Sequence, residues 1–122
     1  MTATDPRQVA EAFSGHRFGD AYAALTENVR WVLVGEGEIN GRQAVIDACE
    51  GTLAELSKGT AEFLRFVVIA EDDAVAVDAV GRYVNADGST SLVSSCDIYQ
   101  FRDGAIASIT TYAVELDPAT TV

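Results

Sequence analysis

The sequence predicts an α+β domain in which helices pack against the concave face of a strongly curved antiparallel sheet. Two observations lead to this fold class. Helical patterns occupy mainly the first half of the 122-residue chain, and four strand patterns follow one another in the second half. The turns between these strands are short and carry acids or Asp-Gly, as tight hairpins require. Helices and strands are thus segregated, which excludes an alternating βαβ architecture.

The first predicted helix begins at Asp5-Pro6, where an acidic cap precedes a proline at the first helical position. Its apolar residues stand three and four positions apart, so they share one face: Val9, Ala12 and Phe13. Ser14-Gly15 ends this helix.

Further elements follow in the order short helix, strand, short strand, long helix and four strands. The short helix covers residues 19–26, the first strand covers Val29–Val34, and a short strand begins at Ile39. A long amphipathic helix runs from about Arg42 to Leu56. The four remaining strands are expected over residues 61–70, 74–84, 91–101 and 105–115, and the tail from 117 to 122 is expected to be frayed.

Length and composition indicate one domain over residues 1–122 with a core large enough to fold without disulfides or metals. Hydrophobic residues make up 48% of the chain, which excludes a disordered protein. The formal net charge is −11, so the chain would repel nucleic-acid phosphates and anionic lipid surfaces. We therefore expect neither nucleic acid nor a membrane as a partner.

Cysteine usage and the start of the chain predict a cytoplasmic protein. The segment Met1–Arg7 is polar and lacks the apolar core of a signal peptide, and no apolar run approaches the ~20 residues of a membrane span. Cys49 and Cys96 are expected to be reduced and to act as small buried hydrophobes. We expect no cofactor and no metal, because the chain lacks a phosphate-binding loop, a nucleophile elbow and familiar metal-ligand spacing.

Two aspartates are candidate acid–base groups. If Asp87-Gly88 forms a two-residue turn, Asp78 lies opposite Asp97, and Arg82 shares their face. Two opposed carboxylates cannot both ionise cheaply, so the pKa of one would rise. A change of one residue in the register would instead place the two aspartates on opposite faces of the sheet.

His16 is the only histidine and the only side chain whose unperturbed pKa lies near neutrality. It is a candidate general base, hydrogen-bonded to Asp97 or to a ligand; the alternative is a solvated loop residue. Trp31 is either a core residue or a pocket wall that stacks on a flat ligand or donates its indole N–H. The other candidate ligand-binding residues are Phe13, Arg82, Tyr99, Ile109 and Thr111. Glu36 and Glu38 flank Gly37 in a loop that could gate a pocket or bind a cation, or simply be solvated.

The chain resembles the SnoaL-like branch of the nuclear transport factor 2-like superfamily, which contains the ketosteroid isomerases. The stretch that carries most of this resemblance is Cys96–Ile106, followed by Tyr112, with support from Phe18-Gly19-Asp20, Trp31 and Gly41-Arg42. The resemblance implies a cone-like barrel with a central apolar pocket and, in many members, a homodimer formed through the sheet. Members include isomerases, cyclases, dehydratases and binding proteins without chemistry.

Individual positions limit which of these activities the resemblance supports. Asp97 lies where ketosteroid isomerases place the neutral aspartic acid of their oxyanion hole. The tyrosine of that site falls at Ala12, and its general base falls near Val32 or Leu33, so two of three positions are apolar here. The epoxide hydrolase residues of the superfamily fall near Ala79, Gly81 and Thr111 and are also absent.

We therefore expect a pocket protein for a small apolar or aromatic, polyketide- or steroid-like, molecule. As an enzyme it would be a cofactor-free isomerase, cyclase or dehydratase, with Asp97 as acid or oxyanion donor and His16 or Asp78 as base. The alternative is a non-catalytic binding or homodimerisation module. In that case the outer sheet residues Cys96, Ile98, Tyr112 and Val114 would form a self-complementary apolar patch.

Overall fold

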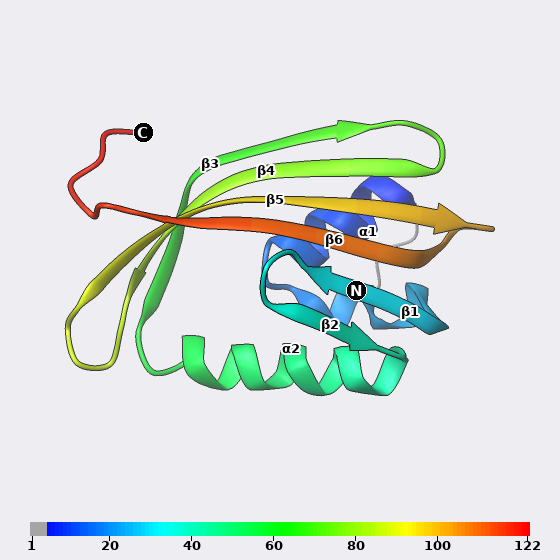
Figure 1. Ribbon diagram of the computed structural model, residues 1–122, viewed down its shortest axis with the longest axis horizontal. Helices are drawn as coiled ribbons and strands as arrows, with labels where there is room; N and C mark the ends of the chain where they lie inside the picture. Colours follow the sequence, from blue (N-terminus) through cyan, green and yellow to red (C-terminus); the bar gives the residue numbers. More distant parts are fainter. Residues whose placement is uncertain (1–4) are drawn as a thin grey trace.

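The structure is a computed structural model that describes residues 5–122 of the chain. The first four residues of the polar segment Met1–Arg7, on which the cytoplasmic prediction partly rests, lie outside the described residues. The elements follow in the order α1 (Pro6–Ser14), η1 (Phe18–Ala24), β1 (Leu25–Leu33), β2 (Gly37–Asn40), α2 (Arg42–Leu56), β3 (Thr60–Ala70), β4 (Ala74–Val84), β5 (Thr90–Arg102) and β6 (Ala105–Leu116) (Figure 1).

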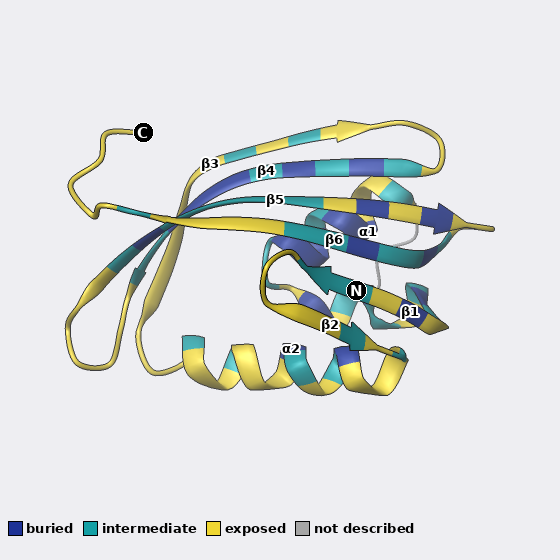
Figure 2. Ribbon diagram, in the orientation of Figure 1, coloured by how far each residue is buried: buried dark blue, intermediate teal, exposed yellow. Residues whose placement is uncertain are grey.

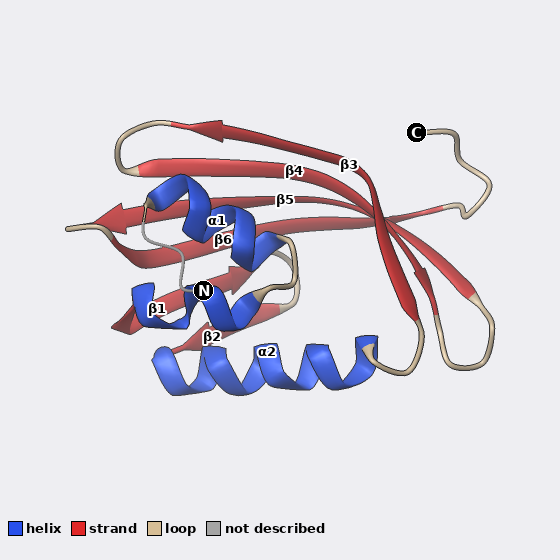
Figure 3. Cartoon of the chain, turned by 180° about the vertical axis from the view of Figure 1, so that it is seen from behind, coloured by secondary structure: helices blue, strands red, loops and turns tan. Residues whose placement is uncertain are grey.

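The predicted α+β class is confirmed. Six strands form one sheet in the order β2-β1-β6-β5-β4-β3, antiparallel throughout except for the parallel pair β1–β6. The helices lie on one face of this sheet, as the view from behind shows (Figure 3). The sheet is strongly curved but open, with β2 and β3 as its edges, so it does not close into a barrel.

Helix α1 forms for the reasons that the sequence indicates. The Asp5 carboxylate accepts a hydrogen bond of 2.8 Å from the backbone N–H of Gln8, and Pro6 opens the helix. Phe13 and Ser14 are buried in its last turn. The helix ends at Gly15, and His16 then adopts a left-handed backbone with φ of 65°. This conformation is uncommon for residues other than glycine, although histidine is among those enriched there.

Most predicted boundaries agree with the structure within one residue, and those of α2 and β4 agree fully. The largest difference is in β1, which begins at Leu25 rather than Val29. The stretch Thr26-Glu27-Asn28 is polar and lacks the apolar pattern of a strand, so the sequence did not predict this part of β1. Its pairing with β6 is irregular between Leu25 and Arg30, so the polar residues lie at a bulge rather than in a regular ladder.

The register of the β4–β5 hairpin corrects the prediction for the two aspartates. The last pair before the loop is Val84 with Thr90, so five residues connect the strands instead of the two of an Asp87-Gly88 turn. The Asp87 carboxylate accepts hydrogen bonds from the backbone N–H and hydroxyl of Ser89 at 2.9 and 2.6 Å. As a result Asp97 pairs with Val77 while Asp78 pairs with Cys96. The expectation of a shared acidic face is wrong, and the alternative register is correct.

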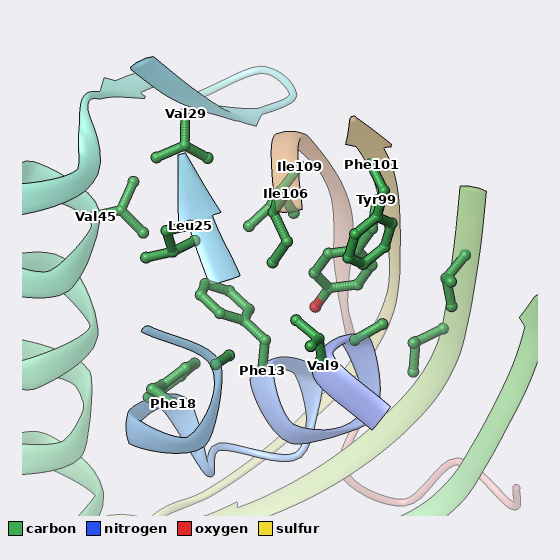
Figure 4. Packing of buried hydrophobic residues seen from close by; sticks show 14 of the residues in the cluster. Val9, Phe13, Phe18, Leu25, Val29, Val45, Tyr99, Phe101, Ile106 and Ile109 are labelled. Carbon is green, nitrogen blue, oxygen red and sulfur yellow. The ribbon is translucent and has the colours of Figure 1, made fainter. Parts of the chain in front are cut away.

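The core lies between the concave face of the sheet and the helices (Figure 2). Figure 4 shows side chains from α1, η1, α2 and the strands β1, β5 and β6 converging there. Phe13 stands at the centre, and its ring makes edge contacts with Phe18, Trp31 and Tyr99 at centroid distances of 5.0, 5.2 and 6.0 Å. Among the described residues, no helix is both long and apolar enough to cross a membrane.

Candidate functional site

A cavity of about 260 Å³ opens between the concave face of the sheet and the end of α1. Most of its wall is apolar and aromatic, and the polar groups gather around Asp97 and His16. The lining residues are Phe13, Ser14, His16, Phe18, Trp31, Leu33, Thr52, Phe63, Tyr83, Val93, Ser95, Asp97 and Thr111. An apolar pocket with a few convergent polar groups is the usual form of a small-molecule site.

Asp97 is held by hydroxyl groups on both carboxylate oxygens. Ser14 donates its hydroxyl to Oδ2 at 2.7 Å, and Thr111 donates to Oδ1 at 2.7 Å. Burial raises the pKa of Asp97 because it disfavours the charged carboxylate, while the two hydroxyl donors and nearby His16 oppose that rise. The direction of the shift fits an aspartic acid that exchanges protons closer to neutrality than an exposed one.

His16 is part-buried and lines the same cavity, so it is not a fully solvated loop residue. Its ring lies 5.1 Å from the ring of Phe63, 5.8 Å from that of Phe18 and 6.0 Å from that of Tyr83. Burial among these rings lowers its pKa, and the charge of Asp97 only partly offsets this. The imidazole is therefore mainly neutral at pH 7 and can accept a proton. No hydrogen bond between His16 and Asp97 is present in the described structure.

Trp31 and Thr111 both line the cavity, and they interact with each other. The indole N–H of Trp31 donates to the Thr111 hydroxyl at 2.9 Å. Trp31 thus fills both roles that the sequence left open, because it packs against the core and also forms part of the pocket wall. Phe13 likewise belongs to both core and wall.

Tyr99 and Ile109 lie behind the cavity rather than in its wall. Both side chains are fully buried, and neither lines the cavity, so the prediction of direct ligand contact is wrong for them. They pair across β5 and β6, one step along the same face from Asp97 and Thr111. The Tyr99 hydroxyl lies 2.5 Å from the Ser14 hydroxyl. Figure 4 shows this phenol oxygen pointing towards α1.

Asp78 and Arg82 lie on the outer, convex face of the sheet. Asp78 accepts from Arg65 at 2.8 and 2.9 Å, so it is an exposed ion-pair partner rather than a base in the cavity. Arg82 pairs with Leu92 and lines a groove of about 300 Å³ with Glu62 of β3. The one-residue error in register moved both side chains to the wrong face.

Ser14, Tyr83, Ser95 and Phe63 line the cavity, and the sequence prediction did not assign them to the site. Ser14 was interpreted only as part of a helix stop, although a small hydroxyl residue at the end of a buried helical face is a usable signal. Tyr83 packs over Gly81, where an added Cβ would lie 2.7 Å from the phenol oxygen. Burial and the charge of Asp97 raise the pKa of Tyr83.

Glu36 and Glu38 lie in the exposed β1–β2 hairpin. Glu38 is paired with Arg30 at 2.6 and 2.8 Å, and this pairing lowers its pKa. Within residues 5–122, no group of three or more His, Cys, Asp or Glu side chains could hold a metal ion. A larger, open hollow of about 460 Å³ at the start of α2 has a mostly polar surface lining, without the aromatic wall of the central cavity.

Comparison with known proteins agrees with this geometry. Residues 7–109 match the model of the SnoaL-like domain. A solved NTF2-like protein of unknown function from Cytophaga hutchinsonii is 30% identical, with 87% of this chain and 93% of that chain covered and a TM-score of 0.76.

Two more distant structures share the fold. A candidate polyketide cyclase from Xanthomonas campestris is 23% identical, with 85% of this chain and 83% of that one covered and a TM-score of 0.68. A candidate isomerase from Rhodopseudomonas palustris is 16% identical, with 86% and 82% covered and a TM-score of 0.65. A comparison with functionally curated proteins gave no match. The match over residues 7–109 and the relative from Cytophaga hutchinsonii show that the chain belongs to the SnoaL-like domain family of NTF2-like proteins.

Proposed function

We propose that the protein binds a small, flat, largely apolar molecule in the central cavity and performs cofactor-free acid–base chemistry on it. The observation that carries this proposal is the pair of titratable groups, Asp97 and His16, in one aromatic cavity with opposite pKa shifts. A raised pKa favours a neutral acid and a lowered pKa favours a neutral base, which is the combination that proton transfer at neutral pH requires.

The size of the cavity limits the ligand. A cavity of about 150 Å³ accommodates benzene, and drug-sized ligands occupy about 300–1,000 Å³. The volume of about 260 Å³ thus suits one or two fused rings better than the four rings of a steroid. The aromatic side chains of Phe13, Phe18 and Trp31 offer edges and faces for such a ring.

The chemistry that suits these groups is the shift of a proton next to a carbonyl. In this reaction His16 removes a proton from the carbon beside the carbonyl, and neutral Asp97 donates a hydrogen bond to the developing enolate oxygen. The imidazolium then returns the proton at another carbon, so no net charge or redox partner is needed. The candidate isomerase and cyclase among the distant structural neighbours support this class of reaction only through the shared fold.

Carbon-detected NMR titration of the Asp97 carboxyl tests the proposal. The pKa of Asp97 is expected above the ordinary value of ~4 and is expected to move when β-naphthol or β-tetralone is added, because the ligand enters the same cavity. β-Tetralone should also exchange its α-hydrogens for deuterium faster with the protein than without it. A pKa near 4 that neither ligand changes, with no catalysed exchange, would favour a binding module instead.

A second candidate function, homodimerisation, is favoured by the outer face of the sheet. Five large apolar side chains of this face, on strands β3, β5 and β6, are more than a third exposed: Val67, Ile69, Ile98, Tyr112 and Val114. Cys96 lies between them, opposite both Asp78 and Tyr112, and is half-buried. The Asp78 carboxylate at the centre is paired with Arg65, so it adds no unpaired charge to this apolar face. A second copy of the chain is therefore the partner that we propose for it.

Val114→Asp is expected to weaken this dimer about tenfold or more, because it places a charge in the apolar contact. Val34→Asp is the matched control, since Val34 is also exposed but lies in the loop between β1 and β2. Sedimentation velocity at micromolar concentration measures both variants. A wild-type protein that is already monomeric there would rule the dimer out.

A further inference from the structure

The hydrogen bonds around Asp97 form two chains, and the chemistry of the group at the outer end of each chain indicates the donor direction. On one side, the Trp31 indole can only donate, so the Thr111 hydroxyl accepts from it at 2.9 Å and directs its own hydrogen to Asp97 Oδ1 at 2.7 Å. The first chain therefore runs from Trp31 through Thr111 to the carboxyl group.

The second chain runs through the end of α1. The Tyr99 hydroxyl is fully buried, and within residues 5–122 Ser14 is its hydrogen-bonding partner, at 2.5 Å. If Tyr99 donates to Ser14, the single hydroxyl hydrogen of Ser14 is free for Asp97 Oδ2 at 2.7 Å. If Ser14 instead donated to Tyr99, the hydroxyl hydrogen of Tyr99 would have no acceptor, which is costly for a buried group. The second chain therefore also ends at the carboxyl group as a donor.

We propose that Tyr99 and Trp31 are positioning residues that act through Ser14 and Thr111 to hold both oxygens of Asp97 as hydrogen-bond acceptors, so that Asp97 exchanges its proton only with the cavity. Each carboxyl oxygen has a second lone pair, and the hydroxyl chains leave these free. A proton on either oxygen then points away from the protein hydroxyls. This inference rests on the proposed function for its meaning. Tyr99 lies behind the cavity wall, whereas Trp31 also forms part of that wall, so the test is made without a ligand.

The electrostatic consequence can be tested without a ligand. Donors to the charged form stabilise the carboxylate and so oppose the rise that burial causes. The titratable groups that interact electrostatically with Asp97 are His16, Tyr83 and Tyr99 on the inner face of the sheet and Cys96 on the outer face. Replacing Tyr99 or Trp31 leaves the Ser14 or Thr111 hydroxyl on Asp97 but removes the donor that polarises and orients that hydroxyl, so the Asp97 pKa should rise by a few tenths of a unit.

The experiment is the carbon-detected titration of Asp97 in the ligand-free protein. Tyr99→Phe removes only a hydroxyl from a ring that stays packed, and Trp31→Phe removes the donor at the start of the other chain. Both are expected to raise the Asp97 pKa by a few tenths of a unit. Tyr112→Phe is the matched control, because Tyr112 is half exposed on the outer face, and it should leave the titration unchanged.

The sign of the change decides the outcome. If Asp97 instead donated to Ser14, the chain would stabilise the neutral acid, and Tyr99→Phe would lower the pKa. A lowered or unchanged pKa in both variants would overturn the inference, whatever the wild-type protein binds. The proposed function fails separately, when β-naphthol and β-tetralone leave the wild-type titration unchanged and α-hydrogen exchange is not catalysed.

Discussion

Asp97→Asn is expected to slow the exchange of the α-hydrogens of β-tetralone by about a hundredfold or more. Acid–base and oxyanion-stabilising groups typically contribute at least that factor, and an amide N–H is a much weaker acid than the neutral carboxyl group of Asp97, so it stabilises the enolate oxygen less. The amide also has one acceptor oxygen for two hydroxyl donors, so one of the Ser14 and Thr111 hydroxyls would meet an N–H instead. Exchange is measured by the loss of proton NMR signal in deuterated buffer, at equal protein concentrations.

Asp78→Asn provides the matched control for this prediction. It makes the same chemical change on the outer face, where Asp78 pairs with Arg65 and is exposed. Exposed ion pairs contribute only about 0–1 kcal/mol, so this variant should fold and retain the full exchange rate. Unaltered exchange in Asp97→Asn, with the fold intact by amide spectra, would remove Asp97 from the chemistry.

The fold was largely predictable because local signals and the global architecture agree in this chain. Helix α1 has its cap, its proline and its apolar face within ten residues, and the turns of the sheet carry acids and glycine. Such agreement between local and tertiary preferences is what makes a pattern reliable. The open edges of the sheet could not be inferred in this way, because closure depends on how far six strands curl together.

The site was only partly predictable, and the reason is the register of one hairpin. A five-residue loop between Val84 and Thr90 looks, in sequence, like a two-residue Asp87-Gly88 turn with flanking strand residues. Since side chains alternate with a period of two, a slip by one residue exchanged the inner and outer faces of β4 relative to β5. Asp97 remained in the cavity, whereas Asp78 and Arg82 moved out of it.

The supporting residues were missed for a different reason. Ser14 and Asp97 are 83 positions apart, and Ser14 and Tyr99 are 85 apart, so their contacts exist only after α1 packs on the sheet. No local pattern marks such a pair. The chemical types were visible in the sequence, but their convergence is a property of tertiary packing.

Phe13→Ala is the substitution for which the largest loss of stability is expected. Its ring is 2% exposed and contacts Phe18, Trp31 and Tyr99, so removing it leaves a void that these rings cannot all fill. Truncation of a buried phenylalanine costs about 3–5 kcal/mol, a large share of the roughly 5–15 kcal/mol by which such a domain is stable. Urea unfolding followed by tryptophan fluorescence measures this loss.

Phe63→Ala separates the effect of burial from the effect of losing a cavity-wall aromatic ring. Phe13 and Phe63 both line the cavity, but Phe63 is 36% exposed on edge strand β3. Its replacement by alanine should therefore lower the stability by only roughly 1 kcal/mol. The difference between the two variants reports how firmly the end of α1 is anchored to the sheet. Since Ser14 follows Phe13 directly, that anchoring also fixes the hydroxyl that holds Asp97. Equal losses in the two variants would mean that α1 is not held through Phe13, and the geometry of the site would then need another source of rigidity.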